Sequence, residues 1–253
     1  MGQKICLFSL KKPFVALTPF GKKMPADRFY LKENFKLGDV VFLEEEEFHH
    51  LNRVMRKKEG DAIELVNGMG SLAQAKVLQI EKRKASLEIL ETSEHKPKLP
   101  PLVLIQALPK LSHLEWIVQK GTELGCTAFY LFPSERSEKD SLSNNQWKRL
   151  ESIAIGAMKQ CGRLDLPSLH LALSLESLSL PEGHAFFGDP EAETSLPKGK
   201  SPYLLFIGPE KGFSKEEYKK MKERFNAQGV RLHPYILRTE TAAIAALTLA
   251  SAQ

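Results

Sequence analysis

The chain has 253 residues, of which 42% are hydrophobic and 26% charged, a composition typical of a protein with a buried core. No segment approaches the roughly 18 consecutive apolar residues that span a bilayer, which argues against a membrane protein. The net charge is +5, but residues 1–23 hold five of the 36 basic residues and no acidic one, leaving 31 basic against 31 acidic residues. The total charge therefore does not by itself indicate a nucleic-acid partner.

The N-terminal segment, residues 1–23, is basic and interrupted by prolines. Because Met24 has the character of a natural start, we interpret this segment as an extension that is not native, with a transit peptide as the alternative. The three cysteines, Cys6, Cys126 and Cys161, form no CxxC pair and no zinc-ligand spacing. A sparse, odd set of this kind predicts a cytoplasmic protein with no structural metal.

Residues 24–94 predict a small β-barrel with one helix. Apolar residues near period two indicate strands at 38–43, 61–66, 72–80 and 85–89. A helix is expected over residues 44–58, with Phe48, Leu51, Val54 and Met55 on one face. The proline-containing stretch 95–101 predicts a linker.

Residues 102–253 predict an α/β domain with a largely parallel sheet. Buried strands are expected at 102–108, 127–132, 185–187, 203–207 and 230–237, and helices at 112–124, 145–161, 214–228 and 239–252. Ligands of such sheets gather at the carboxyl ends of the strands.

The first informative segment at a strand end is Gly208-Pro209-Glu210-Lys211-Gly212-Phe213. Ser214 and Glu217 follow it with the spacing of a capping box, which predicts a helix start. The segment lacks the Gly-Lys-Ser/Thr of a Walker A loop and is not a GxGxxG turn. The residues alone leave a structural turn and a ligand-binding loop open.

The second segment is Ile236-Leu237-Arg238-Thr239-Glu240-Thr241-Ala242, which leads into an alanine-rich helix. Thr239 or Thr241 is expected to cap this helix, and Glu240 suits its first turn. Arg238 is expected at the carboxyl end of a buried strand, a position that favours a functional role over that of a surface cation.

Together the two segments resemble the RsmE family, a branch of the knotted SPOUT methyltransferases. The family pattern Gly-Pro-Glu-Gly-Gly-Phe is matched except that Lys211 replaces a glycine, and Ile-Leu-Arg-Thr-Glu-Thr-Ala follows at 236–242. Further similarities cover nearly all of the chain from Met24 onward, at residues 49–61, 110–125, 133–137, 147–149 and 160–167.

The resemblance implies a PUA-like barrel followed by a SPOUT α/β domain with a C-terminal trefoil knot, acting as a homodimer. It implies S-adenosylmethionine as the cofactor, held by the loops at 187–189, 207–212 and 236–242. The residues implied in cofactor binding are Phe187, Gly188, Ile207, Gly208, Pro209, Gly212, Ile236, Leu237, Thr239, Thr241 and Ala242.

The activity implied is methylation of N3 of a uridine in small-subunit (16S) ribosomal RNA, naked or in the assembled subunit. N3 becomes nucleophilic only after losing its proton, so a cation such as Arg238 is expected to stabilise the uracil anion. Glu210 and Glu240 are the two candidate proton acceptors, and the sequence does not choose between them.

RNA contacts are expected from basic residues in three places. Arg53, Arg56, Lys57 and Lys58 lie on the barrel, the turn 82–84 is also basic, and the resemblance adds Arg136 and Arg163. Solvated surface faces are the alternative for such runs, and the acidic run 44–47 would repel phosphate nearby.

Three residues depart from the family pattern: Lys211, His233 and Tyr235. They keep open a noncatalytic RNA-binding relative that has lost the cofactor. A second alternative is another SPOUT methyltransferase that acts on tRNA or on a ribose hydroxyl.

Overall fold

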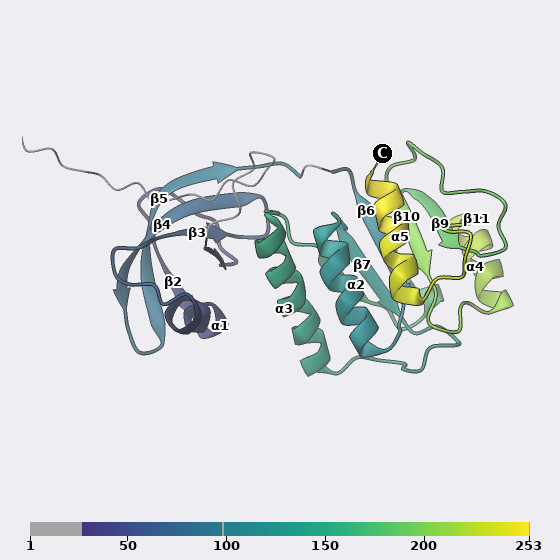
Figure 1. Ribbon diagram of the computed structural model, residues 1–253, viewed down its shortest axis with the longest axis horizontal. Helices are drawn as coiled ribbons and strands as arrows, with labels where there is room; N and C mark the ends of the chain where they lie inside the picture. Colours follow the sequence, from purple (N-terminus) through teal and green to yellow (C-terminus); the bar gives the residue numbers. More distant parts are fainter. Residues whose placement is uncertain (1–26, 98, 253) are drawn as a thin grey trace, which may run out of the picture.

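The computed structural model describes residues 27–97 and 99–252 (Figure 1). The segment 1–23, interpreted above as an extension, lies outside the described residues. The chain forms a curled N-terminal sheet followed by a layered α/β domain (Figure 1). In the part of the chain that the structure describes, no helix is long and apolar enough to cross a membrane.

The N-terminal sheet has five strands in the order β1-β3-β4-β5-β2. They are β1 (Arg28–Tyr30), β2 (Val40–Glu44), β3 (Ala62–Val66), β4 (Ser71–Ile80) and β5 (Lys84–Glu94). β1 pairs parallel to β3, and the other ladders are antiparallel. With β1 and β2 at its edges the sheet is a half-barrel around a core that includes Leu43, Leu65 and Leu87. The four predicted strands are confirmed, whereas β1 was missed because three residues show no periodicity.

The predicted helix over 44–58 is wrong in length and in part of its face. The chain forms α1 (Glu45–His49) and then a π-helical turn, His50–Val54. A π-turn holds an extra residue, which rotates the following side chains away from the face that a 3.6-residue period predicts. Phe48 and Leu51 are buried, but Val54 is 59% exposed.

The α/β domain contains a six-stranded sheet in the order β11-β9-β10-β6-β7-β8, with every ladder parallel. The strands are β6 (Leu102–Ala107), β7 (Ala128–Phe132), β8 (Ser168–Leu171), β9 (His184–Gly188), β10 (Tyr203–Ile207) and β11 (Gln228–Val230). The helices are α2 (Leu111–Glu123), α3 (Asn144–Cys161), α4 (Lys215–Phe225) and α5 (Thr239–Ser251).

Alternating residues of the central strands face two separate cores. Leu102 and Leu104 of β6 join the core formed with α2, α3 and α5. Val103 and Ile105 face the opposite side, where Met221 of α4 is buried. Helices thus cover both faces of the sheet, as Figure 1 shows, and the predicted α/β class is confirmed.

One strand prediction in this domain was wrong, and one strand was missed. The strand expected over 230–237 ends at Val230, and residues 232–238 form a loop that leads into α5. Val230 pairs with Gly188, the last residue of β9, so the ladder has no partner beyond it, and Pro234 in the loop that follows has no N–H for a ladder. β8 was missed because it is a short edge strand whose residues are mostly exposed. Arg238 therefore does not lie at the end of a strand.

The N-terminal sheet and the α/β domain are joined by contacts at two places. Lys159 Nζ of α3 lies 2.5 Å from Glu47 Oε1 of α1. The backbone N–H of Leu166 donates to Gly68 O at 2.8 Å, across from the turn between β3 and β4.

Candidate cofactor-binding site

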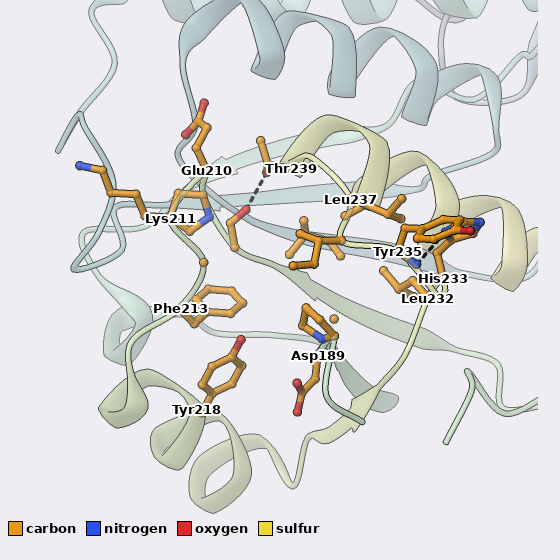
Figure 2. Close-up of a pocket in the computed structure, with 18 residues that line it drawn as sticks. Asp189, Glu210, Lys211, Phe213, Tyr218, Leu232, His233, Tyr235, Leu237 and Thr239 are labelled. Atoms are coloured by element: carbon orange, nitrogen blue, oxygen red, sulfur yellow. Dashed lines mark hydrogen bonds between the residues drawn. The ribbon is translucent and has the colours of Figure 1, made fainter. Parts of the chain in front are cut away.

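A cavity of about 320 Å³ opens at the carboxyl ends of β9 and β10, near the lower end of the usual size of ligand pockets. Three segments line it, within the ranges 188–190, 207–218 and 232–242 (Figure 2). Both informative segments of the sequence contribute, which is what the parallel topology predicts for a ligand site.

In the first wall of the cavity, formed by the loop after β10, glycines allow the backbone to pack closely. A Cβ on Gly208 would lie 3.2 Å from Gly212 Cα and 3.3 Å from Phe213 N, and Gly212 itself has a φ of +67°. The chain therefore folds back on itself so closely that any side chain at Gly208 would displace backbone. Gly188 is less confined, since a Cβ there would meet only the ends of side chains, with Leu232 Cδ1 at 3.3 Å.

The second wall begins at the N-terminus of α5. Arg238 occupies the cap position without a side-chain hydrogen bond, so the prediction that Thr239 or Thr241 caps this helix is wrong. Thr239 instead donates its hydroxyl hydrogen to Gly208 O at 2.6 Å. Gln106 of β6 donates to Thr239 Oγ1 at 3.1 Å. These contacts hold the start of α5 against the end of β10.

Aromatic and acidic side chains form the far side of the cavity (Figure 2). The rings of Phe213 and Tyr218 meet edge to face with centroids 5.7 Å apart. Burial and the nearby carboxylate of Asp189 raise the pKa of Tyr218, so its hydroxyl keeps its proton and can serve as a hydrogen-bond donor.

Glu210 lies at the rim with its carboxylate directed away from the cavity (Figure 2). Its Oε1 accepts from the backbone N–H of Lys110 and from His113 Nδ1, each at 2.9 Å. Partial burial raises the pKa of Glu210, but these hydrogen bonds outweigh that effect and leave the pKa below its ordinary value. Such a carboxylate is a weak proton acceptor.

Lys211, the residue that departs from the family pattern, is exposed, and its ammonium points away from the cavity (Figure 2). Arg136 Nη1 donates to the Lys211 carbonyl at 3.2 Å. The lysine therefore does not fill the cavity, and it brings a second cation beside Arg136.

Nine of the eleven predicted cofactor residues line the cavity. Phe187 is buried at 1% exposure and Thr241 is exposed, and neither lines the cavity. Arg238 and Glu240 also lie outside its lining. The catalytic and cofactor roles of all these residues stay predictions.

The predicted RNA-binding residues differ in what they contact. Arg53, Arg56 and Lys58 are exposed, whereas Lys57 forms an ion pair with Asp27.

Arg163 has side-chain partners within the protein. Its guanidinium donates to the carbonyls of Thr122 and Cys126 and to Asp165, and the side chain is 13% exposed. These contacts give it a role in the fold, and RNA binding by it stays a prediction.

The sequence analysis missed Gln106, Tyr218 and His113. Gln106 had a readable signal, because it is a polar residue in the otherwise apolar strand Leu102–Ala107, and buried polar groups need partners. Tyr218 and His113 gave no signal, since ordinary helix positions do not reveal a neighbouring loop.

Family models match both parts of the chain. An RNA methyltransferase domain matches residues 95–251, and an RNA methyltransferase PUA domain matches residues 43–90. The fold and the cavity thus belong to an RNA methyltransferase with a PUA-like N-terminal domain, which confirms the predicted architecture of the two parts.

Proteins of similar sequence and structure show which family of RNA methyltransferases the chain belongs to. The chain is 35% identical to ribosomal RNA small subunit methyltransferase E of Bacillus subtilis, covering 88% of this chain and 93% of the relative. It superposes with a TM-score of 0.79 on the Neisseria gonorrhoeae enzyme of that name bound to S-adenosyl methionine, at 30% identity over 89% of this chain and 96% of that one. A methyltransferase from Legionella pneumophila in complex with the same cofactor gives 0.81, at 28% identity over 88% and 95% of the two chains. The chain belongs to the RsmE family, ribosomal RNA small subunit methyltransferase E.

Proposed function

We propose that the protein uses S-adenosylmethionine to methylate N3 of a uridine in small-subunit ribosomal RNA. The observation that carries the proposal is the cavity itself. It is lined by the two segments that mark the family, in a chain that superposes on a relative bound to this cofactor.

The residues present fit a cofactor that is bound mainly through backbone and apolar groups. Gly188 and Gly208 place no side chains of their own at the wall, so a planar group can approach the backbone closely. Ile207, Leu237 and Leu232 supply apolar surface. Tyr218 adds a hydroxyl donor.

The cofactor supplies an electrophilic methyl group on a sulfonium. The protein must take the proton from N3, so that the nitrogen lone pair can form the new N–CH3 bond while the S–CH3 bond breaks. Alignment of the two reactants contributes on the order of 7–11 kcal/mol in favourable cases. Arg238 is our candidate for stabilising the uracil oxygens as negative charge develops.

Of the two candidate proton acceptors, the contacts favour Glu240. Glu210 has a lowered pKa and points away from the cavity. Glu240 is the remaining candidate: its Oε2 has no hydrogen-bond partner in the described structure, but it is buried and lies outside the cavity lining, so the target base would have to reach it from beside the cavity.

The N-terminal domain offers a surface for the RNA. Arg53 and the turn 82–84 line one surface hollow, together with Glu44, Glu45 and Glu81. The basic groups support phosphate contacts, while the acidic ones limit their number. Because N3 lies on the Watson–Crick edge, the target base must be unpaired or flipped out before reaction.

Several further expectations stay proposals: the trefoil knot and the homodimer implied by the family resemblance, the cytoplasmic location indicated by the cysteines, and the domain boundaries at 24–94, 95–101 and 102–253.

The test uses a bacterial strain that lacks its own enzyme of this family and carries this gene. We expect 3-methyluridine to return to 16S RNA in nucleoside mass spectrometry. Its continued absence, although the protein is made and folded, would contradict the proposal. A new methyl group on tRNA or on a ribose would instead indicate another SPOUT activity. Calorimetry with S-adenosylmethionine then tests the noncatalytic alternative, which predicts no binding.

A further inference from the structure

His113, in the first turn of α2, lies between two glutamates from different parts of the chain. Its Nδ1 is 2.9 Å from Glu210 Oε1 in the loop after β10. The same nitrogen is 3.7 Å from Glu240 Oε2 in the first turn of α5. One ring atom thus faces a residue from each wall of the cofactor cavity.

The contacts determine which ring nitrogen carries hydrogen. Both neighbours are carboxylates, which accept hydrogen bonds and do not donate them. Nδ1 must therefore be the protonated nitrogen, with its hydrogen directed at Glu210 and close to Glu240.

Glu240 has a particular need for this neighbour. Its Oε2 is buried without a hydrogen-bond partner, and an unsatisfied buried acceptor is destabilising, more so when it is charged. Among the described residues, His113 is the nitrogen that the structure places within ion-pair distance of this oxygen.

The position of the ring joins the two cavity walls from outside. Glu210 sits within the wall segment that includes Gly208, and Glu240 follows Thr239 directly. On the inside, the hydrogen bond from Thr239 to Gly208 joins the same walls. Removing the outer contact leaves two carboxylates near each other, and the walls are then joined by the inner hydrogen bonds of Thr239 and Gln106.

We infer that His113 is a positioning residue: its Nδ1–H donates to Glu210 at 2.9 Å while the same nitrogen lies 3.7 Å from Glu240, and the ring so fixes the spacing of the two cofactor-binding walls. The inference rests on the proposed cofactor, and it adds a residue of α2, outside the cavity lining, as a determinant of cofactor affinity. His113 touches neither cofactor nor substrate in this role.

Three variants separate the hydrogen bond from the bulk of the ring: H113A, H113N and H113Q. The amide nitrogen of asparagine is as many bonds from Cα as Nδ1, whereas that of glutamine corresponds to Nε2. We expect H113A to bind S-adenosylmethionine about tenfold more weakly in calorimetry, equivalent to about 1.4 kcal/mol. H113N is expected to recover most of that loss and H113Q little of it.

Kinetics provide a second readout. In H113A we expect KM for S-adenosylmethionine to rise while KM for the RNA stays unchanged, since His113 acts through the two cofactor-binding walls. Circular dichroism and the melting temperature check that each variant is folded. Unchanged cofactor affinity in folded H113A, or H113N no better than H113A, would overturn the inference.

A double-mutant cycle covers the case of a destabilised single variant. If His113 acts through Glu240, cofactor affinity in H113A/E240A should be no lower than in either single variant. Additive losses would contradict the inference. Failure of the wild-type protein to bind the cofactor would contradict the proposed function instead, so the two failures are distinguishable.

Discussion

Gln106 donates its side-chain amide to Thr239 Oγ1 at 3.1 Å, which links the buried strand β6 to the first turn of α5. Thr239 in turn donates its hydroxyl hydrogen to Gly208 O. These two hydrogen bonds connect the interior of the sheet with both walls of the cofactor cavity. Gln106 and Thr239 should therefore affect both the stability of the protein and its affinity for the cofactor.

Replacing Thr239 with valine keeps the shape and removes the hydroxyl. We expect the free energy of unfolding to fall by about 1–2 kcal/mol, because Gly208 O loses its shortest hydrogen bond. Urea denaturation measures the change. The exposed Thr241→Val variant is the control and should differ from wild type by less than about 0.5 kcal/mol. Equal effects at both sites would contradict the role of Thr239.

Gly208→Ala introduces a methyl group where backbone already lies at 3.2 Å. We expect the loop to move and the affinity for S-adenosylmethionine to drop at least about tenfold, since ligand sites tolerate little displacement. Gly156→Ala is the matched control because a Cβ there meets nothing within 4 Å. As a helical position of α3, it should gain about 0.5–1 kcal/mol in stability. Calorimetry and thermal melts decide the comparison.

Lys211→Ala should leave cofactor affinity unchanged, because the ammonium points away from the cavity (Figure 2). We expect weaker RNA binding and a salt dependence whose slope is reduced by about one. Binding titrations at several salt concentrations provide the measurement. A large change in cofactor affinity would mean that the lysine acts on the cavity after all.

Arg238→Ala should fold normally, since Arg238 is exposed and its side chain makes no capping hydrogen bond. We expect methylation to fall about 100-fold or more, the usual cost of losing a group that stabilises developing negative charge. Single-turnover assays measure the chemical step. A fully active variant would remove Arg238 from the proposed site.

Acid should reveal the contacts of Glu210. Its folded-state pKa is lowered, so its contribution to stability is present above the unfolded-state pKa of about 4.3 and is lost as the pH falls through the folded-state value. We expect Glu210→Gln to lose less stability than wild type between about pH 5 and pH 3. An equal loss of stability in wild type and Glu210→Gln over this pH range would contradict a lowered pKa at Glu210.

The sequence predicted the central features of the site because they are local. A buried run followed by Gly208-Pro209, and a capping box at Ser214 and Glu217, each specify a turn through neighbouring residues, and the structure contains both.

Features that depend on distant contacts could not be predicted. The apolar residues after Val230 suggested a strand, but the ladder ends at Val230 because its partner β9 ends at Gly188. The ring of His113 meets Glu210 only because α2 and the loop after β10 are neighbours in space. Likewise, the fold determines where the side chains of Lys211 and Glu210 point, and this cannot be read from the residue types alone.

The two contacts between the N-terminal sheet and the α/β domain have a consequence for the choice of RNA substrate. With Glu47 held by Lys159 and Gly68 joined to Leu166, the N-terminal surface and the cofactor cavity keep a set separation. An RNA that touches both must present its phosphates and its reactive base at that same spacing. If the proposed RNA surface is correct, we expect the protein to distinguish two RNAs with identical sequence around the uridine by their folded shape.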